Sequence, residues 1–380
     1  MANFKIDLKR IKEKINYAET LLNSNELSLN ERERIKHTIL AYYAILDSSD
    51  NIYNTTIRPF LDKITNGKYS ERRESKLLCK TGELTLDKDD YGLLTKKYLE
   101  KLIKFSIEIE KPQVESTKFN SMEFSDEELK NIALAFFKSI DSEMLKSTNK
   151  ILSTPSLINI SDYRSANNID GTTYYDYIAS VPYIIISRNH TIEDAQVFVH
   201  ELMHANDFLM QPKYFDSNYY GFHETPSYCC DLLFADFMEL IGVNKDEVNK
   251  IRTERINYIR GLAHQALSQI RAKVGREKFW ANDIDAIYNV IDESILKKLL
   301  EVESGIMAIG LYTQISHDKN HGVNNLKTFM KSLISKNETP NFSYIGLDDE
   351  ALMSVCSNIK THCCDLDNYN VKKDITPKVS

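Results

Sequence analysis

The stretch that decides the fold is Val199-His200-Glu201-Leu202-Met203-His204-Ala205. An α-helix has about 3.6 residues per turn, so His200 and His204 lie one above the other on the same face and can bind one metal ion. Glu201 lies beside this pair, where its carboxylate can accept a proton from a water molecule. The spacing therefore predicts a helix that carries two zinc ligands and a general base.

The residues around this pattern are mostly apolar, because Val197 and Phe198 precede it and Leu202 and Met203 lie within it. Such a helix is buried on most sides. Imidazole and carboxylate groups in a buried helix need partners, and a metal ion would supply them. The alternative is a pair of core histidines that make hydrogen bonds and bind no metal. The apolar flanks favour the metal.

The whole chain has the composition of a mainly helical globular protein. It has 380 residues, of which 42% are hydrophobic and 27% charged, and its 12 glycines and 8 prolines allow few tight turns. The net charge is −7 and neither sign forms a long block, which disfavours a nucleic-acid-binding protein. We find no apolar run long enough for a signal peptide or a membrane span, so a cytoplasmic location without membrane attachment is expected. In that compartment the six cysteines are expected to be reduced.

The pattern along the chain predicts three regions. Residues 1–120 form an N-terminal helical region that is part of a cleft or lid, residues 121–365 form the catalytic region, and residues 366–380 form a tail. A helical hairpin is expected over residues 5–65, with a capping box from Ser28 to Glu31. Residues 63–90 are polar and poorly periodic, which favours a long connection or lid. Trp280, in Lys278-Phe279-Trp280, is expected in the core.

Residues 171–177 and 181–187 give the strong strand signals of the chain. Thr191 and Asp194 then predict the cap of the helix that carries the histidines. A strand is therefore expected just before the metal-binding helix. Its residues 183–187 could offer an edge that holds an extended peptide by main-chain hydrogen bonds.

Two histidines leave a catalytic zinc ion short of its third protein ligand. Asp207 lies on the same face as His204, but about 4.5 Å further along the helix axis. Glu224 is the better candidate, because Pro226 marks the first turn of a second apolar helix and places Glu224 at its start. His223 is a rival ligand. Asp231, two turns after Glu224, could orient a histidine ring from outside the ligand shell.

These residues resemble the thimet oligopeptidase and oligoendopeptidase F family of zinc metallopeptidases. The resemblance rests on the histidine motif at residues 200–204, on Glu224-x-Pro226-Ser227, and on the acid at Asp231. It implies a mainly α fold around a deep substrate cleft, with a small β-sheet beside the metal-binding helix. It also implies that His200, His204 and Glu224 bind zinc, that Glu201 is the general base, and that the substrates are oligopeptides or unfolded segments.

The sequence departs from that family in three ways. The spacer between His204 and Glu224 has 19 residues, fewer than expected, and the chain is short for the family. The family also places a histidine and tyrosines on a late helix to bind the oxyanion, whereas residues 299–306 contain neither. The alternative donors here are Tyr219, Tyr220, His223, Tyr228 and Tyr288. The alternative function is a catalytically impaired zinc-binding helical protein that captures a peptide or protein partner. No pattern indicates the oligomeric state.

Overall fold

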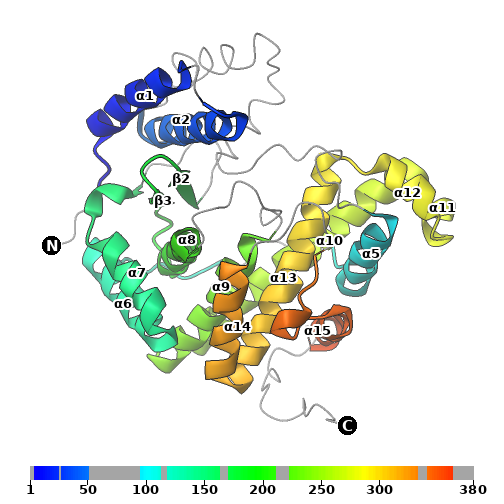
Figure 1. Ribbon diagram of the computed structural model, residues 1–380. Coiled ribbons are helices and arrows are strands. Elements are labelled where there is room, and N and C mark those ends of the chain that lie inside the picture. Colours follow the sequence, from blue (N-terminus) through cyan, green and yellow to red (C-terminus); the bar gives the residue numbers. More distant parts are fainter. Residues whose placement is uncertain are drawn as a thin grey trace. The chain divides into compact units, whose positions relative to one another are not determined.

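The computed structural model describes residues 4–24, 27–50, 95–112, 118–162, 170–210, 222–332 and 340–362 (Figure 1). The chain divides into two compact units: residues 1–85 with 120–215, and residues 86–119 with 216–380. Each unit is therefore discontinuous in sequence. The three consecutive regions expected above stay a prediction. The expected lid at residues 63–90 and the expected tail at 366–380 lie outside the described residues.

The first unit combines helices with a small sheet. Its elements in chain order are α1 (Leu8–Leu22), α2 (Leu29–Asp50), α6 (Asp126–Ile140), α7 (Ser142–Leu152), the 3-10 turn η2 (Pro155–Leu157), β1 (Ile158–Ser161), β2 (Gly171–Asp176), β3 (Val181–Ser187) and α8 (Glu193–Met210). The capping box at Ser28 is confirmed, because Ser28 Oγ accepts the backbone N–H of Glu31 at 3.3 Å and Glu31 Oε2 accepts the backbone N–H of Ser28 at 2.8 Å. The hairpin expected over residues 5–65 is confirmed as far as Asp50.

The sheet has the strand order β1-β3-β2, with β1 parallel and β2 antiparallel to β3. Ile184 pairs with Ile158 on one side and with Thr173 on the other. The expectation that residues 183–187 offer a free edge is therefore wrong. Strand order depends on pairing across the chain, which the local pattern of β3 does not contain. Among the described residues, β2 is the outer strand on its side of the sheet.

Helices cover both faces of this sheet (Figure 1). Tyr183 and Ile185 belong to the apolar cluster that α1 and α2 form on one face. Side chains alternate along a strand, so the fully buried Ile184 and Ile186 point to the other face, where α8 packs on β3. The small sheet predicted beside the histidine-bearing helix is thus confirmed.

The start of α8 is fixed by side-chain caps. The buried carboxylate of Asp194 accepts the backbone N–H groups of Asn189, at 2.6 Å, and His190, at 3.2 Å. Thr191 Oγ1 accepts the N–H of Glu193 at 3.2 Å. The first N–H groups of a helix have no partner within it, so the bond from Glu193 to Thr191 caps the first turn of α8. The bonds from Asn189 and His190 to Asp194 instead fix the segment that leads into the helix.

The second unit is helical. It contains α5 (Lys96–Ile109), α9 (Glu224–Leu240), α10 (Lys245–Val274), α11 (Arg276–Trp280), α12 (Ile284–Val290), α13 (Glu293–His317), α14 (Lys319–Lys331), the 3-10 turn η5 (Ser343–Ile345) and α15 (Asp349–His362). The helix α13 packs on α9 and α10, and it passes so close to α10 that a Cβ at Gly305 would lie 2.6 Å from Ile259 side-chain atoms. Trp280 is 65% exposed, so the expectation that it lies in the core is wrong.

A mainly α fold with a small sheet is therefore confirmed. The cysteines at positions 229, 230 and 356 are buried and form no disulfide within the described part of the chain, and the other three lie outside it. Within the described part of the chain, every helix is too short or too polar to cross a membrane.

The carboxylate of Asp176 joins the helical hairpin to the sheet. It is fully buried at the end of β2, where it accepts hydrogen bonds from Lys14 Nζ at 2.8 Å and from the Tyr42 hydroxyl. It also accepts the backbone N–H groups of Ile178, at 3.1 Å, and Ala179, at 2.8 Å, in the turn to β3. One side chain thus holds α1, α2 and the turn together.

We expect Asp176→Ala to lower the free energy of unfolding by about 3 kcal/mol, because it removes one partner of a buried ion pair and leaves several donors without an acceptor. Denaturant unfolding followed by circular dichroism measures this change. Glu13→Ala, at an exposed acid of α1, is the control and should change stability by less than about 0.5 kcal/mol. Equal stability of the two variants would contradict the assigned role of Asp176.

Candidate functional site

The two histidines of α8 face each other through their Nε2 atoms, which lie 3.2 Å apart. His204 is buried and His200 is half-buried. Two nitrogens bound at 2.0–2.1 Å to one tetrahedral zinc ion would lie roughly 3.3 Å apart. The observed separation is close to that value, and it is also the length of a hydrogen bond between the two rings.

The carboxylate of Glu201, which lies between the two histidines in sequence, contacts strand β2 of the sheet. Glu201 is only 5% exposed. Thr173 Oγ1, on β2, lies 2.7 Å from Glu201 Oε2 and 2.9 Å from the Glu201 carbonyl oxygen. The Thr173 hydroxyl can donate its single hydrogen to either acceptor, both on the same residue. This contact fixes the carboxylate and leaves Oε1 without a hydrogen bond among the described residues.

The strand β2 approaches α8 closely at this point because Gly171 has no side chain. A Cβ at Gly171 would lie 2.4 Å from Val197 Cγ1, 2.9 Å from Glu201 Cγ and 3.0 Å from Glu201 Oε1. Gly171 and Thr173 are two residues apart, so they lie on the same face of the strand. Tyr175, two residues further, stacks on Phe208 of α8 with ring centroids 4.6 Å apart. This face of β2 therefore packs closely against α8.

The remaining acidic candidate on α8, Asp207, is buried one turn after His204. The choice of third ligand between Asp207, His223 and Glu224 stays a prediction.

In the second unit, Glu224 is the first residue of α9, as the position of Pro226 predicts. Ser227 Oγ lies 3.0 Å from both Glu224 Oε2 and the Glu224 carbonyl oxygen, so its one hydrogen can be donated to either. His223 Nε2 lies 3.1 Å from Glu224 Oε1. The Glu224 side chain is 23% exposed. Its carboxylate is therefore oriented by neighbours on both oxygens and still accessible from solvent, as a metal ligand must be before it binds.

Asp231, on α9, lies in an ion pair that the sequence analysis missed. Its Oδ2 lies 2.6 Å from Arg255 Nη2 on α10. Burial alone would lower the pKa of Arg255, but Asp231 and the neighbouring Tyr228, Tyr258 and Glu224 together outweigh it and raise that pKa above its usual range. The Arg255 guanidinium also lies over the Tyr228 ring, 4.2 Å from its centroid. The predicted role of Asp231 in orienting a histidine ring stays a prediction.

Two tyrosines meet at one carboxylate in this unit. The Tyr228 hydroxyl donates to Glu301 Oε1 on α13 at 2.7 Å, and the Tyr258 hydroxyl, on α10, donates to the same oxygen at 2.8 Å. Burial, together with the negative charges of Glu301 and Glu224, raises the pKa of Tyr228 well above its ordinary value. Both hydroxyls therefore stay protonated at neutral pH.

Tyr258 and Arg255 were missed by the sequence reasoning, although their spacing of three residues on a helix places them on one face. Of the other oxyanion candidates, His223 contacts Glu224 and Tyr288 is half-buried on α12. Tyr219 and Tyr220 lie outside the described residues.

Two solved structures are similar to this chain. PZ peptidase A, solved with an inhibitor, has a TM-score of 0.50 and 12% sequence identity, over 95% of this chain and 85% of that chain. A candidate oligoendopeptidase F has a TM-score of 0.51 and 11% identity, over 95% of this chain and 81% of that chain. No protein-family model and no curated protein matches the sequence. The structural likeness shows a shared fold, and at that level it confirms the resemblance to the oligoendopeptidase F family.

We expect Gly171→Ala to lower the free energy of unfolding by about 1–3 kcal/mol, because the added methyl group overlaps Val197 and forces β2 away from α8. Denaturant unfolding measures the loss. The double variant Gly171→Ala/Val197→Ala is the control, since it removes the nearest overlapping atoms and should lose less stability relative to Val197→Ala alone. A loss from Gly171→Ala that is the same in both backgrounds would argue against close contact between β2 and α8.

Proposed function

We propose that this chain is a zinc-dependent metallopeptidase that hydrolyses internal peptide bonds of oligopeptides or unfolded segments. The observation that carries the proposal is the arrangement on α8. The Nε2 atoms of His200 and His204 lie 3.2 Å apart, close to the separation of two ligands of one zinc ion, and the buried carboxylate of Glu201 contacts Thr173. The fold shared with PZ peptidase A and an oligoendopeptidase F supports it.

His200, His204 and Glu224 would hold the zinc ion. The donor set of two imidazoles and one carboxylate is the one that catalytic zinc sites use, with the fourth position left for water or substrate. When bound, zinc supplies a Lewis acid that polarises a peptide carbonyl and makes water more acidic. Glu224 suits the role because Ser227 and His223 orient its two oxygens. Asp231 would orient one of the histidine rings, with Arg255 as its charge partner.

Glu201 would act as general base and then as general acid. Its Oε2 is engaged by Thr173, so Oε1 is the oxygen that accepts the proton of the attacking water. The same carboxylate then passes that proton to the leaving amine. Burial of Glu201 against β2 keeps this oxygen at a fixed place through both transfers.

The substrate would lie along β2 rather than along β3. The two neighbours of β3 occupy both of its edges, whereas β1 and β2 are the outer strands of the described sheet, and of these two β2 contacts Glu201. A peptide that adds to this edge by main-chain hydrogen bonds would pass close to Glu201, because Thr173 of the same strand contacts the carboxylate. The proposed substrate is thus a peptide in extended conformation. The net charge of −7, without a long block of positive charge, disfavours nucleic acid as a substrate.

A second candidate function is a zinc-binding protein that captures a peptide or protein partner without turnover. The observation that favours it is the engagement of both Tyr228 and Tyr258 with Glu301. A hydroxyl that donates to Glu301 cannot donate at the same time to an oxyanion. His223, Tyr288, Tyr219 and Tyr220 are then the remaining candidates for oxyanion stabilisation.

Two isosteric variants separate the proposed roles of the acids. We expect Glu201→Gln to keep stoichiometric zinc and to lose peptide hydrolysis by about 10²–10⁴-fold, because general acid–base catalysis contributes that much. We expect Glu224→Gln to weaken zinc binding by about 100-fold or more, since even residues outside the ligand shell contribute 10–100-fold. Competition with a chromophoric chelator measures zinc affinity, and cleavage of a quenched fluorescent peptide measures hydrolysis.

Glu239→Gln, at the other end of α9, is the matched control and should keep both zinc and activity. Full hydrolysis by the Glu201→Gln variant would contradict the proposed mechanism. Wild-type zinc affinity in the Glu224→Gln variant would instead remove Glu224 from the ligand set.

A further inference from the structure

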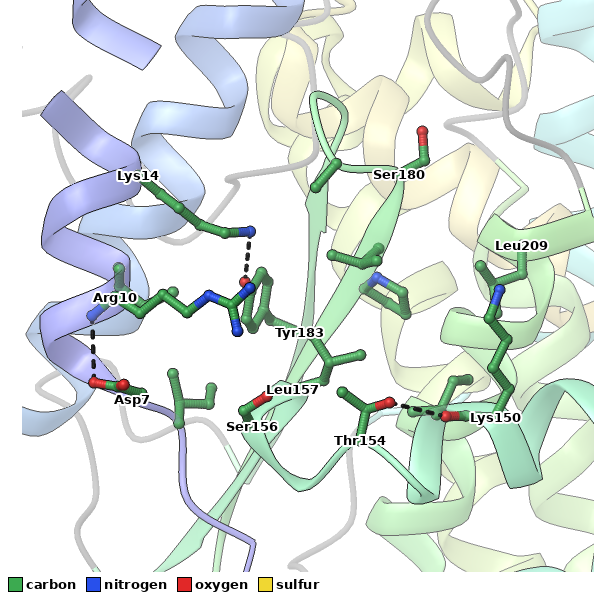
Figure 2. Close-up of a pocket in the computed structure, with 16 residues that line it drawn as sticks. Asp7, Arg10, Lys14, Lys150, Thr154, Ser156, Leu157, Ser180, Tyr183 and Leu209 are labelled. Carbon is green, nitrogen blue, oxygen red and sulfur yellow. Dashed lines mark hydrogen bonds between the residues drawn. The ribbon is translucent and has the colours of Figure 1, made fainter. Parts of the chain in front are cut away.

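The first unit contains a pocket of about 250 Å³ between α1, the α7–η2 connection and the start of β3 (Figure 2). Tyr183 of β3 lines it, and Leu209, near the end of α8, borders it as well. Neither Glu201 nor Thr173 is among the described residues that line the pocket, so a ligand bound there need not be the peptide substrate.

Positive charge dominates the polar lining of this pocket. Arg10 and Lys150 contribute two cations, against the single carboxylate of Asp7, and the charge of Lys14 is balanced by its ion pair with Asp176. Asp7 already accepts the backbone N–H groups of Lys9, at 3.0 Å, and Arg10, at 3.3 Å, as the cap of α1. Within the described part of the chain, neither the Arg10 nor the Lys150 side chain forms an ion pair, so their charges are available to a bound anion.

Lys14 and Tyr183 add a buried hydrogen-bond donor to the pocket. Lys14 Nζ binds Asp176 at 2.8 Å and donates to the Tyr183 hydroxyl at 2.9 Å. Tyr183, which is 4% exposed, is thus an acceptor in this contact. Its own hydroxyl hydrogen has no acceptor among the residues that the structure describes. The hydroxyl of Ser156, across the pocket in Figure 2, is likewise without a partner there.

The rest of the lining is apolar and the space is small. Ile6, Ile11, Val181, Pro182 and Leu209 supply hydrocarbon surface around the donors. The pocket is smaller than the roughly 300–1,000 Å³ of sites for drug-sized ligands. It therefore suits a group the size of one apolar side chain with an attached anion, and not an extended peptide.

We propose that this pocket binds a carboxylate attached to an apolar group, with Arg10 and Lys150 as the charge partners and Tyr183 as a hydrogen-bond donor. The α-carboxylate of a peptide that ends in an apolar residue has this chemistry, and so does a short aliphatic acid. In Figure 2, Arg10 extends from α1 toward Tyr183, and Lys150 borders the pocket from the α7 side. This site is independent of the proposed peptidase function.

Isothermal titration calorimetry on the full chain tests the proposal, with N-acetyl-leucine as the probe and N-acetyl-leucinamide as its uncharged match. Hexanoate tests the aliphatic source of the carboxylate, and inorganic phosphate tests an anion without an apolar group. The variants are Arg10→Gln and Lys150→Gln. Lys12→Gln, at an exposed position of α1 outside the pocket, is the control of equal charge change. Circular dichroism and denaturant unfolding establish that each variant is folded.

The proposal predicts saturable binding of N-acetyl-leucine by the wild-type chain and none of the amide. Arg10→Gln and Lys150→Gln should each weaken binding by about tenfold or more, as expected for a lost charge-assisted hydrogen bond, and Lys12→Gln should not. Equal binding of hexanoate assigns the site to apolar carboxylates in general, and a preference for N-acetyl-leucine assigns it to peptide C-termini.

Three results would overturn the proposal. The first is no saturable binding of either carboxylate up to about 20 mM, a range that covers even weak sites. The second is unchanged affinity in both pocket variants. The third is phosphate binding as tight as that of N-acetyl-leucine, since the apolar wall would then have no part in recognition.

Discussion

The structure around α8 depends on one contact, the hydrogen bond between Thr173 of β2 and the buried carboxylate of Glu201. An apolar helix cannot carry a buried carboxylate without a partner, because the loss of hydration costs several kcal/mol. The strand supplies that partner only because Gly171 lets its backbone come close to the helix. The same contact that satisfies the carboxylate also fixes its position. The contact with Thr173 thus accounts both for the burial of the Glu201 carboxylate and for its fixed position.

The sheet gives its two faces different roles. One face supports the helix that carries the histidines, and the other is covered by the α1–α2 hairpin, which Asp176 fastens to the end of β2. Lys14 belongs to this fastening and also lines the pocket beside Tyr183. A ligand in that pocket would therefore contact the residues that hold the hairpin on the sheet. The residues of α8 that perform the proposed chemistry lie on the opposite side.

Local sequence patterns predicted the features that depend on near neighbours. The spacing of His200 and His204 places their nitrogens together, and the caps at Ser28 and Thr191 appear where predicted, because helix geometry and capping involve residues a few positions apart.

Features that depend on distant parts of the chain were missed. Strand order put β3 in the centre, Thr173 was not recognised as the partner of Glu201, and Arg255 was not paired with Asp231. Trp280 looked like a core residue beside Phe279, yet only Phe279 is buried there.

The measurement that tests the central claim most directly is cleavage of a random peptide library, followed by mass spectrometry, with metal-stripped protein before and after zinc is restored. The account predicts no cleavage by the stripped protein, and new internal cleavage products once one equivalent of zinc is bound. Zinc binding that restores peptide capture but yields no cleavage product would contradict the peptidase and favour the binding protein. Cleavage that persists without metal would contradict the role given to His200 and His204.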